Sequence, residues 1–152
     1  MKRKLLAVSL AAAVGAAVSL DAAAQAKPEV LVKQRQAAMT LQGKYLGPMG
    51  AMAQGKAPYN AQLVQRNAGY LEVLAKMPWD GFDASTKGEK SAALPAVWEK
   101  SAEFKQAAER LENEAAKLVS VARSGDEAAV KAQIGATAKT CGGCHETFRE
   151  KR

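Results

Sequence analysis

The residues best suited to chemistry lie close to the C-terminus, in the run Cys141-Gly142-Gly143-Cys144-His145. On a helix, two thiols three positions apart share one face, and the imidazole follows four positions after the first thiol. This C-x-x-C-H spacing is the sequence form of covalent c-type haem attachment. It lets both sulfurs reach the two vinyl groups of one porphyrin while the imidazole lies beneath the iron.

The same residue types allow three other interpretations: a redox dithiol, half of a zinc site, or a structural disulfide. Zinc sites use four ligands, whereas the chain contains two cysteines and one histidine in total. A disulfide between helical residues this close would be strained unless it served catalysis. A thiol oxidoreductase would also lack its usual α/β context here. The motif therefore predicts one covalent haem c per chain.

The N-terminal segment has the pattern of an export signal. Basic residues at positions 2–4 precede the apolar stretch 5–20, which is shorter than the roughly 20 residues of a membrane span. An Ala-x-Ala sequence that ends at Ala24 suits a signal peptidase. We expect residues 1–24 to be removed; cleavage after Ala26 and an uncleaved anchor are the alternatives. Because haem attachment to C-x-x-C-H occurs outside the bacterial cytoplasm, both features indicate a periplasmic protein.

The mature chain, residues 25–152, is long enough for one ordinary domain with a real core. The whole chain has a formal charge of +7 and stays basic after removal of the signal, which favours acidic redox partners or anionic membrane surfaces without specificity. Its Lys and Arg residues are dispersed, with no basic patch interleaved with aromatics, so nucleic-acid binding is not expected. No nucleophile–base constellation occurs and the only histidine is assigned to iron, so we expect no enzyme.

The composition predicts an all-α domain, because Ala, Leu, Lys, Glu and Gln dominate the mature chain. The first helix is expected to begin at Pro28 and run towards Ala53, with Gly47-Pro48 producing a kink or an early stop. A second helix is expected over about 61–77, with Asn60 as its N-cap. Its predicted core face consists of Leu63, Tyr70, Leu74 and Met77.

Two further helices show the alternating spacing of three and four that is typical of bundle helices. The third has on its seam Val97, Ser101, Phe104, Ala108, Leu111, Ala115, Leu118 and Ala122. The fourth, after a break at 124–126, has Val130, Ile134, Thr137, Cys141, Cys144 and Phe148. Since both cysteines lie on this seam, we expect an antiparallel four-helix bundle with the haem in its core. The long segment 78–95 is either a crossover loop pinned by two aromatics or a cover for the haem edge.

An exported four-helix bundle with C-x-x-C-H on its last helix resembles the cytochrome c′ family, or class II cytochromes c. The resemblance covers essentially the whole mature chain. The similar segments are KPEVLVKQRQAAMTLQ at 27–42, GKAPY at 55–59, PW at 78–79, Trp98, Phe104 and CGGCHETFR at 141–149.

The resemblance implies roles for individual residues. Cys141 and Cys144 would form the thioethers, and His145 would be the proximal iron ligand. Arg35 and Gln36 resemble the residues that meet the haem propionates, and a guanidinium suits a carboxylate; the alternative is a solvated helix face. At position 149 the family often has a basic residue close to the proximal imidazole, although this arginine could equally belong to a solvated tail.

Met39 lies where the family presents its distal residue to the iron. A second histidine ligand from the same chain is excluded, because His145 is the only histidine. Ligation by Met39 would raise the potential and suit electron transfer, whereas an apolar Met39 beside an open iron position would admit NO or CO. The sequence leaves open an electron carrier and a gas-binding protein for buffering or sensing. Dimerisation is common in the family, so a homodimer through the first two helices is a further expectation.

Overall fold

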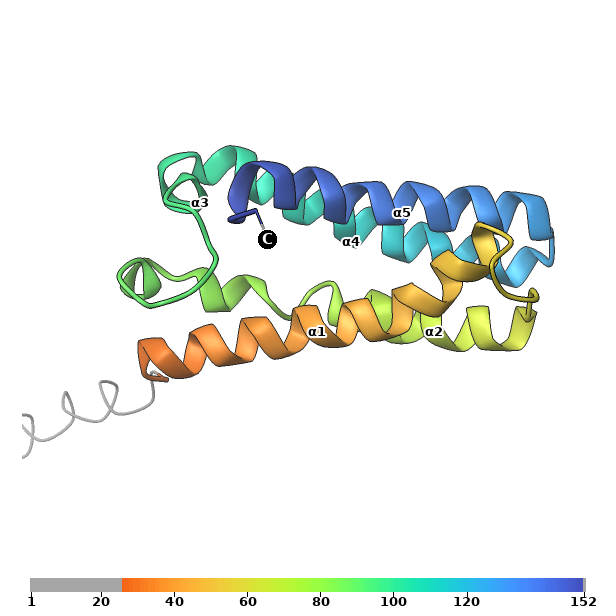
Figure 1. Ribbon diagram of the computed structural model, residues 1–152, viewed down its shortest axis with the longest axis horizontal. Coiled ribbons are helices and arrows are strands. Elements are labelled where there is room, and N and C mark those ends of the chain that lie inside the picture. The colour runs from red at the N-terminus through yellow and green to blue at the C-terminus, as the bar shows by residue number, and fades with distance from the viewer. Residues whose placement is uncertain (1–25, 152) are drawn as a thin grey trace, which may run out of the picture.

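Four long helices run antiparallel along the molecule in the computed structural model, which describes residues 26–151 (Figure 1). They are α1 (Pro28–Ala53), α2 (Ala61–Leu74), α4 (Ser101–Ser124) and α5 (Glu127–Phe148). Each contacts two others, in the closed order α1, α2, α4, α5 and back to α1. The predicted four-helix bundle is therefore confirmed, while the predicted export signal lies outside the described residues.

The helix boundaries follow from local sequence signals. α1 begins at Pro28 as predicted, and Pro48 lies inside the helix rather than ending it. Figure 1 shows the last turns of α1 bending away from the line of the helix, which is the expected effect of an internal proline. Asn60 caps α2 by accepting a hydrogen bond from the Leu63 N–H at 2.9 Å. Gly125, with φ of +79°, ends α4 in the left-handed conformation that favours glycine.

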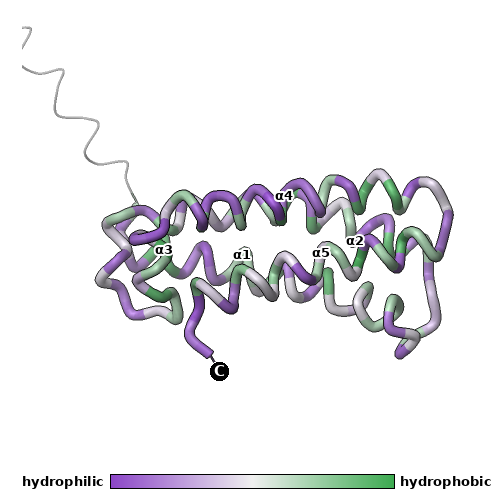
Figure 2. Tube along the Cα trace, turned by 90° about the horizontal axis from the view of Figure 1, so that it is seen from above, coloured by the Kyte–Doolittle hydropathy of each residue, from purple (hydrophilic) through white to green (hydrophobic). Residues whose placement is uncertain are grey.

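The buried seams of α4 and α5 agree with the predicted ones, apart from Val97, which is buried but lies before the start of α4, and Ser101, which is exposed. Phe104, Cys141 and Cys144 are half-buried. In Figure 2, hydrophobic residues recur at intervals along a mostly hydrophilic α4, as expected for a helix with one buried face. The centre of the core lies between all four long helices. Its fully buried members include Met49, Val64, Leu71, Leu118, Val130 and Ile134.

The predicted core face of α2 was only partly right: Leu74 is buried and Leu63 packs half-buried against the core, whereas the other two predicted residues are exposed. Tyr70 and Met77 are 48% and 54% exposed, and α2 ends at Leu74. The buried face is one position round the helix and consists of Val64, Asn67, Ala68, Leu71 and Leu74. The misassignment arose because α2 has apolar residues on two adjoining stripes, and period alone cannot say which stripe meets the core.

The chain between α2 and α4 forms the short helices η2 (Trp79–Phe82), η3 (Ala84–Thr86) and α3 (Ala96–Glu99). η2 and η3 lie against α1, and α3 lies against α4 and α5. Residues 87–95 join these two regions, and we call residues 91–94 of this segment the strap. Ala93 forms an isolated antiparallel bridge with Arg149, just after α5. Within residues 26–151, no helix has the length and apolar character that a membrane span requires.

Candidate haem-binding site

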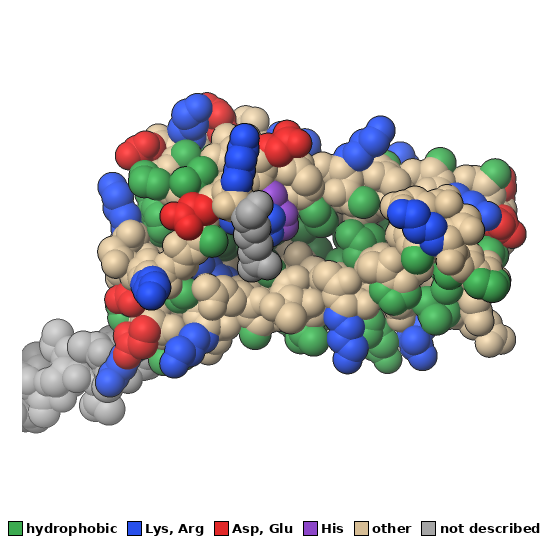
Figure 3. Space-filling model, in the orientation of Figure 1, with side chains coloured by type: hydrophobic (Ala, Val, Ile, Leu, Met, Phe, Trp, Pro, Cys, Tyr) green, Lys and Arg blue, Asp and Glu red, His purple; other side chains and the backbone are tan. Residues whose placement is uncertain are grey.

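A cavity of about 490 Å³ lies between α1, α5 and the strap. Figure 3 shows the histidine, in purple, close to a hollow in this face of the molecule. The walls come from α1, η2, the strap, α4 and α5. The lining residues are Arg35, Gln36, Met39, Thr40, Phe82, Ser91, Ala92, Ala93, Phe104, Cys144, His145, Phe148 and Arg149.

A smaller chamber of about 140 Å³ shares three lining residues with this cavity: Met39, Cys144 and His145. Its other walls are mainly apolar and include Leu46, Trp79, Leu111 and Cys141. The six residues predicted from the motif and the resemblance thus line one of the two adjoining chambers or both. The structure brings them together from helices that are about a hundred residues apart in the sequence.

The helix that carries the two cysteines is fixed in register against α4. The Thr137 hydroxyl donates to the Gln133 carbonyl at 2.9 Å and lies 3.2 Å from the Glu114 carbonyl of α4. The Gln133 amide also donates to the Glu114 carbonyl, at 3.2 Å. These bonds lie one and two turns before Cys141, so they set which residues of α5 face the cavity.

Both thiols lie in surroundings that oppose ionisation. Burial raises the pKa of Cys141 and, together with the charge of the neighbouring Cys141, that of Cys144. The Arg110 guanidinium acts in the opposite direction on Cys144 but does not cancel the effect. A redox dithiol depends on a lowered thiol pKa. The site therefore differs from that of a thiol oxidoreductase.

Arg35 is buried, with 2% of its surface exposed, and is not part of a solvated helix face. Its Nη1 donates to the Gly81 carbonyl and, at 3.0 Å, to the Thr86 hydroxyl, and its Nη2 donates to the Ser91 hydroxyl at 2.9 Å. Its guanidinium carbon lies 4.3 Å from the centre of the Phe82 ring. Because these partners are all uncharged, burial lowers the pKa of Arg35 without a compensating carboxylate.

Two buried donors in the cavity walls lack a hydrogen-bond partner in the described part of the chain: the Arg149 Nε and the Trp79 Nε1. A buried donor without a partner costs about 1–3 kcal/mol. Together with the uncompensated Arg35 cation, they suit an occupant that has anionic or hydrogen-bond-accepting groups. The apolar inner chamber and the two thiols suit a flat, largely apolar occupant with reactive vinyl groups. These features fit a haem.

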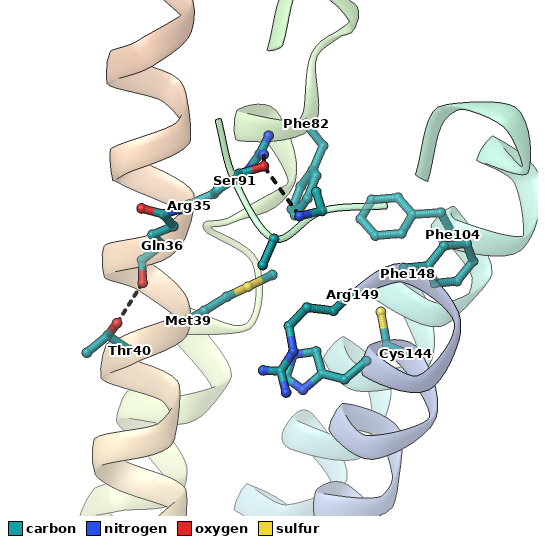
Figure 4. A pocket seen from close by; sticks show the side chains of 13 residues that line it. Arg35, Gln36, Met39, Thr40, Phe82, Ser91, Phe104, Cys144, Phe148 and Arg149 are labelled. Carbon is teal, nitrogen blue, oxygen red and sulfur yellow. Dashed lines mark hydrogen bonds between the residues drawn. The ribbon is translucent and has the colours of Figure 1, made fainter. Parts of the chain in front are cut away.

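Met39 extends from α1 into the space between α1 and α5 (Figure 4), and it is half-buried. It lines both chambers, as His145 does. Gln36 lines the larger cavity but is largely exposed, and its backbone carbonyl accepts a hydrogen bond from Thr40 at 2.8 Å. The site thus has a thioether on one helix wall and the imidazole on another.

Sequence reasoning missed the residues that hold Arg35. Gly81, Thr86 and Ser91 lie 46, 51 and 56 positions after it in the chain. They belong to the segment for which a cover of the haem edge was one of two interpretations, and the strap does form one wall of the cavity. No spacing or motif marks these residues as partners of Arg35.

Comparison with known proteins gives consistent matches. A family model described as Cytochrome C' matches residues 30–149. The cytochrome c' of Rubrivivax gelatinosus is 40% identical over 126 residues, which cover 82% of this chain and 98% of the relative. A cytochrome c-554 of Cereibacter sphaeroides is 34% identical, covering 88% and 91% of the two chains.

Solved structures agree with the sequence matches. A nitric oxide complex of a mutant cytochrome c prime from Alcaligenes xylosoxidans superposes with a TM-score of 0.77 at 35% identity. The match covers 84% of this chain and 99% of that one. The likeness therefore extends over the whole bundle.

Proposed function

Because the chain belongs to the cytochrome c′ family, and so is a c-type haem protein, we propose that it is a periplasmic electron carrier with one haem. Cys141 and Cys144 would hold the haem covalently, and the His145 imidazole would bind its iron. The haem supplies one-electron redox chemistry when bound. The protein binds it, shields it from water and tunes its potential, without turning over a substrate.

The observation that carries this proposal is the placement of Met39 and His145 on the walls of the same two chambers. A thioether and an imidazole as the two axial ligands raise the reduction potential and suit electron transfer. Met39 is held on a long helix that packs against α5, so its approach is set by rigid elements rather than by a loop.

The export signal supports a periplasmic location. Its basic start, apolar stretch and Ala-x-Ala sequence lie within residues 1–24. The basic net charge suits an acidic redox partner, because opposite charges accelerate encounter. A basic surface alone selects no particular partner.

A second candidate function is the binding of NO or CO at an open iron position. It is supported by the nitric oxide complex of the relative from Alcaligenes xylosoxidans and by the flexible, apolar side chain of Met39. In that case Met39 shields the distal face and selects small uncharged ligands rather than binding the iron.

Optical spectra of wild type, Met39→Leu and Met49→Leu separate the two functions. Electron transfer with Met39 as ligand predicts low-spin ferric and ferrous spectra with a Met-to-iron charge-transfer band, all lost in Met39→Leu. Met49→Leu is the matched control, because Met49 is a fully buried methionine of the same helix that does not line either chamber. A high-spin wild type that binds CO and NO readily would favour the gas-binding function instead.

A further inference from the structure

Ser91 occupies a position in the cavity wall that the resemblance does not explain. It lies in the strap, lines the larger chamber, and is next to Arg35 (Figure 4). Its Oγ accepts one hydrogen bond from the Arg35 Nη2 at 2.9 Å and another from the Ala93 N–H at 3.3 Å.

These two bonds determine which hydrogen-bonding group of the Ser91 side chain remains unused. A hydroxyl has two acceptor lone pairs and one donor hydrogen. Both lone pairs of the Ser91 Oγ face donors, and its O–H has no acceptor among the described residues. The remaining O–H is therefore a hydrogen-bond donor at the wall of the cavity.

The charges around the Ser91 O–H favour an anionic acceptor for its hydrogen bond. Arg35 is a buried cation whose described partners are uncharged, and its hydrogen bond to the Ser91 oxygen strengthens the donor character of the O–H. None of the residues that line the larger chamber is an aspartate or a glutamate. The anion that suits Arg35 and Ser91 therefore has to come from the occupant of the cavity.

The strap holds Ser91 in this position from both sides. On one side it is bonded to Arg35 of α1. On the other, the Leu94 N–H donates to the Phe148 carbonyl at 3.0 Å, and the Glu150 N–H donates to the Ala92 carbonyl at 2.9 Å. Because backbone bonds anchor the strap, the Ser91 hydroxyl is preorganised rather than free to swing into solvent.

We propose that Ser91 is a cofactor-positioning residue that donates its hydroxyl hydrogen to a haem propionate, beside the Arg35 guanidinium. This inference rests on the proposed function only in that the protein carries a haem. It holds whether or not Met39 binds the iron. Loss of the Ser91 donor leaves the propionate charge less compensated, which stabilises the ferric state and lowers the reduction potential.

The test uses the haem-loaded wild type and five variants, namely Ser91→Ala, Ser91→Thr, Ser120→Ala, Arg35→Gln and the double variant Arg35→Gln/Ser91→Ala. In Ser91→Ala, the resonance Raman propionate-bending band shifts and the reduction potential falls, while Ser91→Thr, which keeps the hydroxyl, stays close to wild type. Ser120→Ala is the matched control, because the Ser120 hydroxyl lies on the exposed face of α4 and bonds only to the Ala116 carbonyl, at 3.4 Å. It leaves both readouts unchanged.

The double variant, compared with Arg35→Gln alone, separates a direct bond from an effect through Arg35. In an Arg35→Gln background, or Arg35→Lys if the former does not fold, Ser91→Ala still shifts the Raman band. If the shift disappears in that background, or if Ser91→Ala leaves the band unchanged in the wild type, the proposal is overturned. Absence of covalent haem in the mass of the wild-type protein would instead overturn the proposed function, and this inference with it.

Discussion

At the scale of single residues, the site depends on how closely the loop after α2 approaches α1. Gly81 is buried, and its carbonyl accepts a hydrogen bond from Arg35. A Cβ at this position would lie 2.7 Å from the Arg35 Cβ and 2.8 Å from the Leu31 carbonyl oxygen. Because the Leu31 oxygen belongs to the backbone of α1, it cannot move away from an added Cβ unless the helix moves. Only glycine lets this loop reach Arg35 closely enough to hold it.

Gly81→Ala should therefore destabilise the protein by about 1–3 kcal/mol, the usual range for overpacking a tight site. Urea unfolding of the haem-loaded protein, followed by circular dichroism, measures the change. Gly69→Ala in α2 is the control: its added Cβ meets nothing within 4 Å, so the substitution should leave stability unchanged or raise it by up to about 1 kcal/mol. Equal effects of the two substitutions would show that the contact with Arg35 carries no stability.

At the scale of elements, α5 carries the haem motif at one end and a strong cap at the other. The Asp126 carboxylate accepts hydrogen bonds from the Ala128 and Ala129 N–H groups, at 2.9 and 3.1 Å. It satisfies two of the N–H groups that a helix leaves open at its start, and its charge favours the positive end of the helix dipole.

Removing this cap should weaken the bundle without altering the site. Asp126→Ala should lower the free energy of unfolding by about 1 kcal/mol, measured by urea unfolding of the haem-loaded protein. The haem spectrum should stay that of the wild type, because the cap is more than three turns of helix from Cys141. Asp126→Asn keeps a capping oxygen and should recover most of the loss. An altered spectrum in Asp126→Ala would contradict this separation of the two ends.

The sequence predicted those parts of the elements and the site that depend on local spacing. Asn60, Pro28 and the α5 seam could be assigned because each signal acts within a few residues. The core face of α2 could not be assigned fully in this way. Tyr70 and Leu71 are adjacent apolar residues, and only packing against α1 and α4 determines which of the two is buried. The hydrogen-bond partners of Arg35 could not be predicted either, because these contacts join segments about 50 positions apart.

At the scale of the whole molecule, the stripe that the core does not use remains on the surface. We call this surface the α2 stripe; it consists of Tyr70 and Val73 of α2 and of Met77, three residues after its end, which are 48%, 55% and 54% exposed. Tyr45 of α1 extends it, with its ring centre 4.9 Å from that of Tyr70. Contiguous exposed apolar residues of this kind mark interaction surfaces. The stripe lies on the first two helices, through which the sequence analysis expects a homodimer, and self-complementary twofold contacts are the commonest form of oligomer.

A charge placed in the α2 stripe should therefore separate a dimer into monomers. Burying an unpaired carboxylate in an apolar interface is costly, so Val73→Glu should shift the sedimentation coefficient from that of a dimer to that of a monomer. Gln106→Glu adds the same charge to an exposed position of α4 and should leave the dimer intact. The haem spectrum should not change in either variant, because neither residue lines the two chambers. A wild type that sediments as a monomer at all concentrations would rule out the dimer, and the stripe would then be free to meet a different protein.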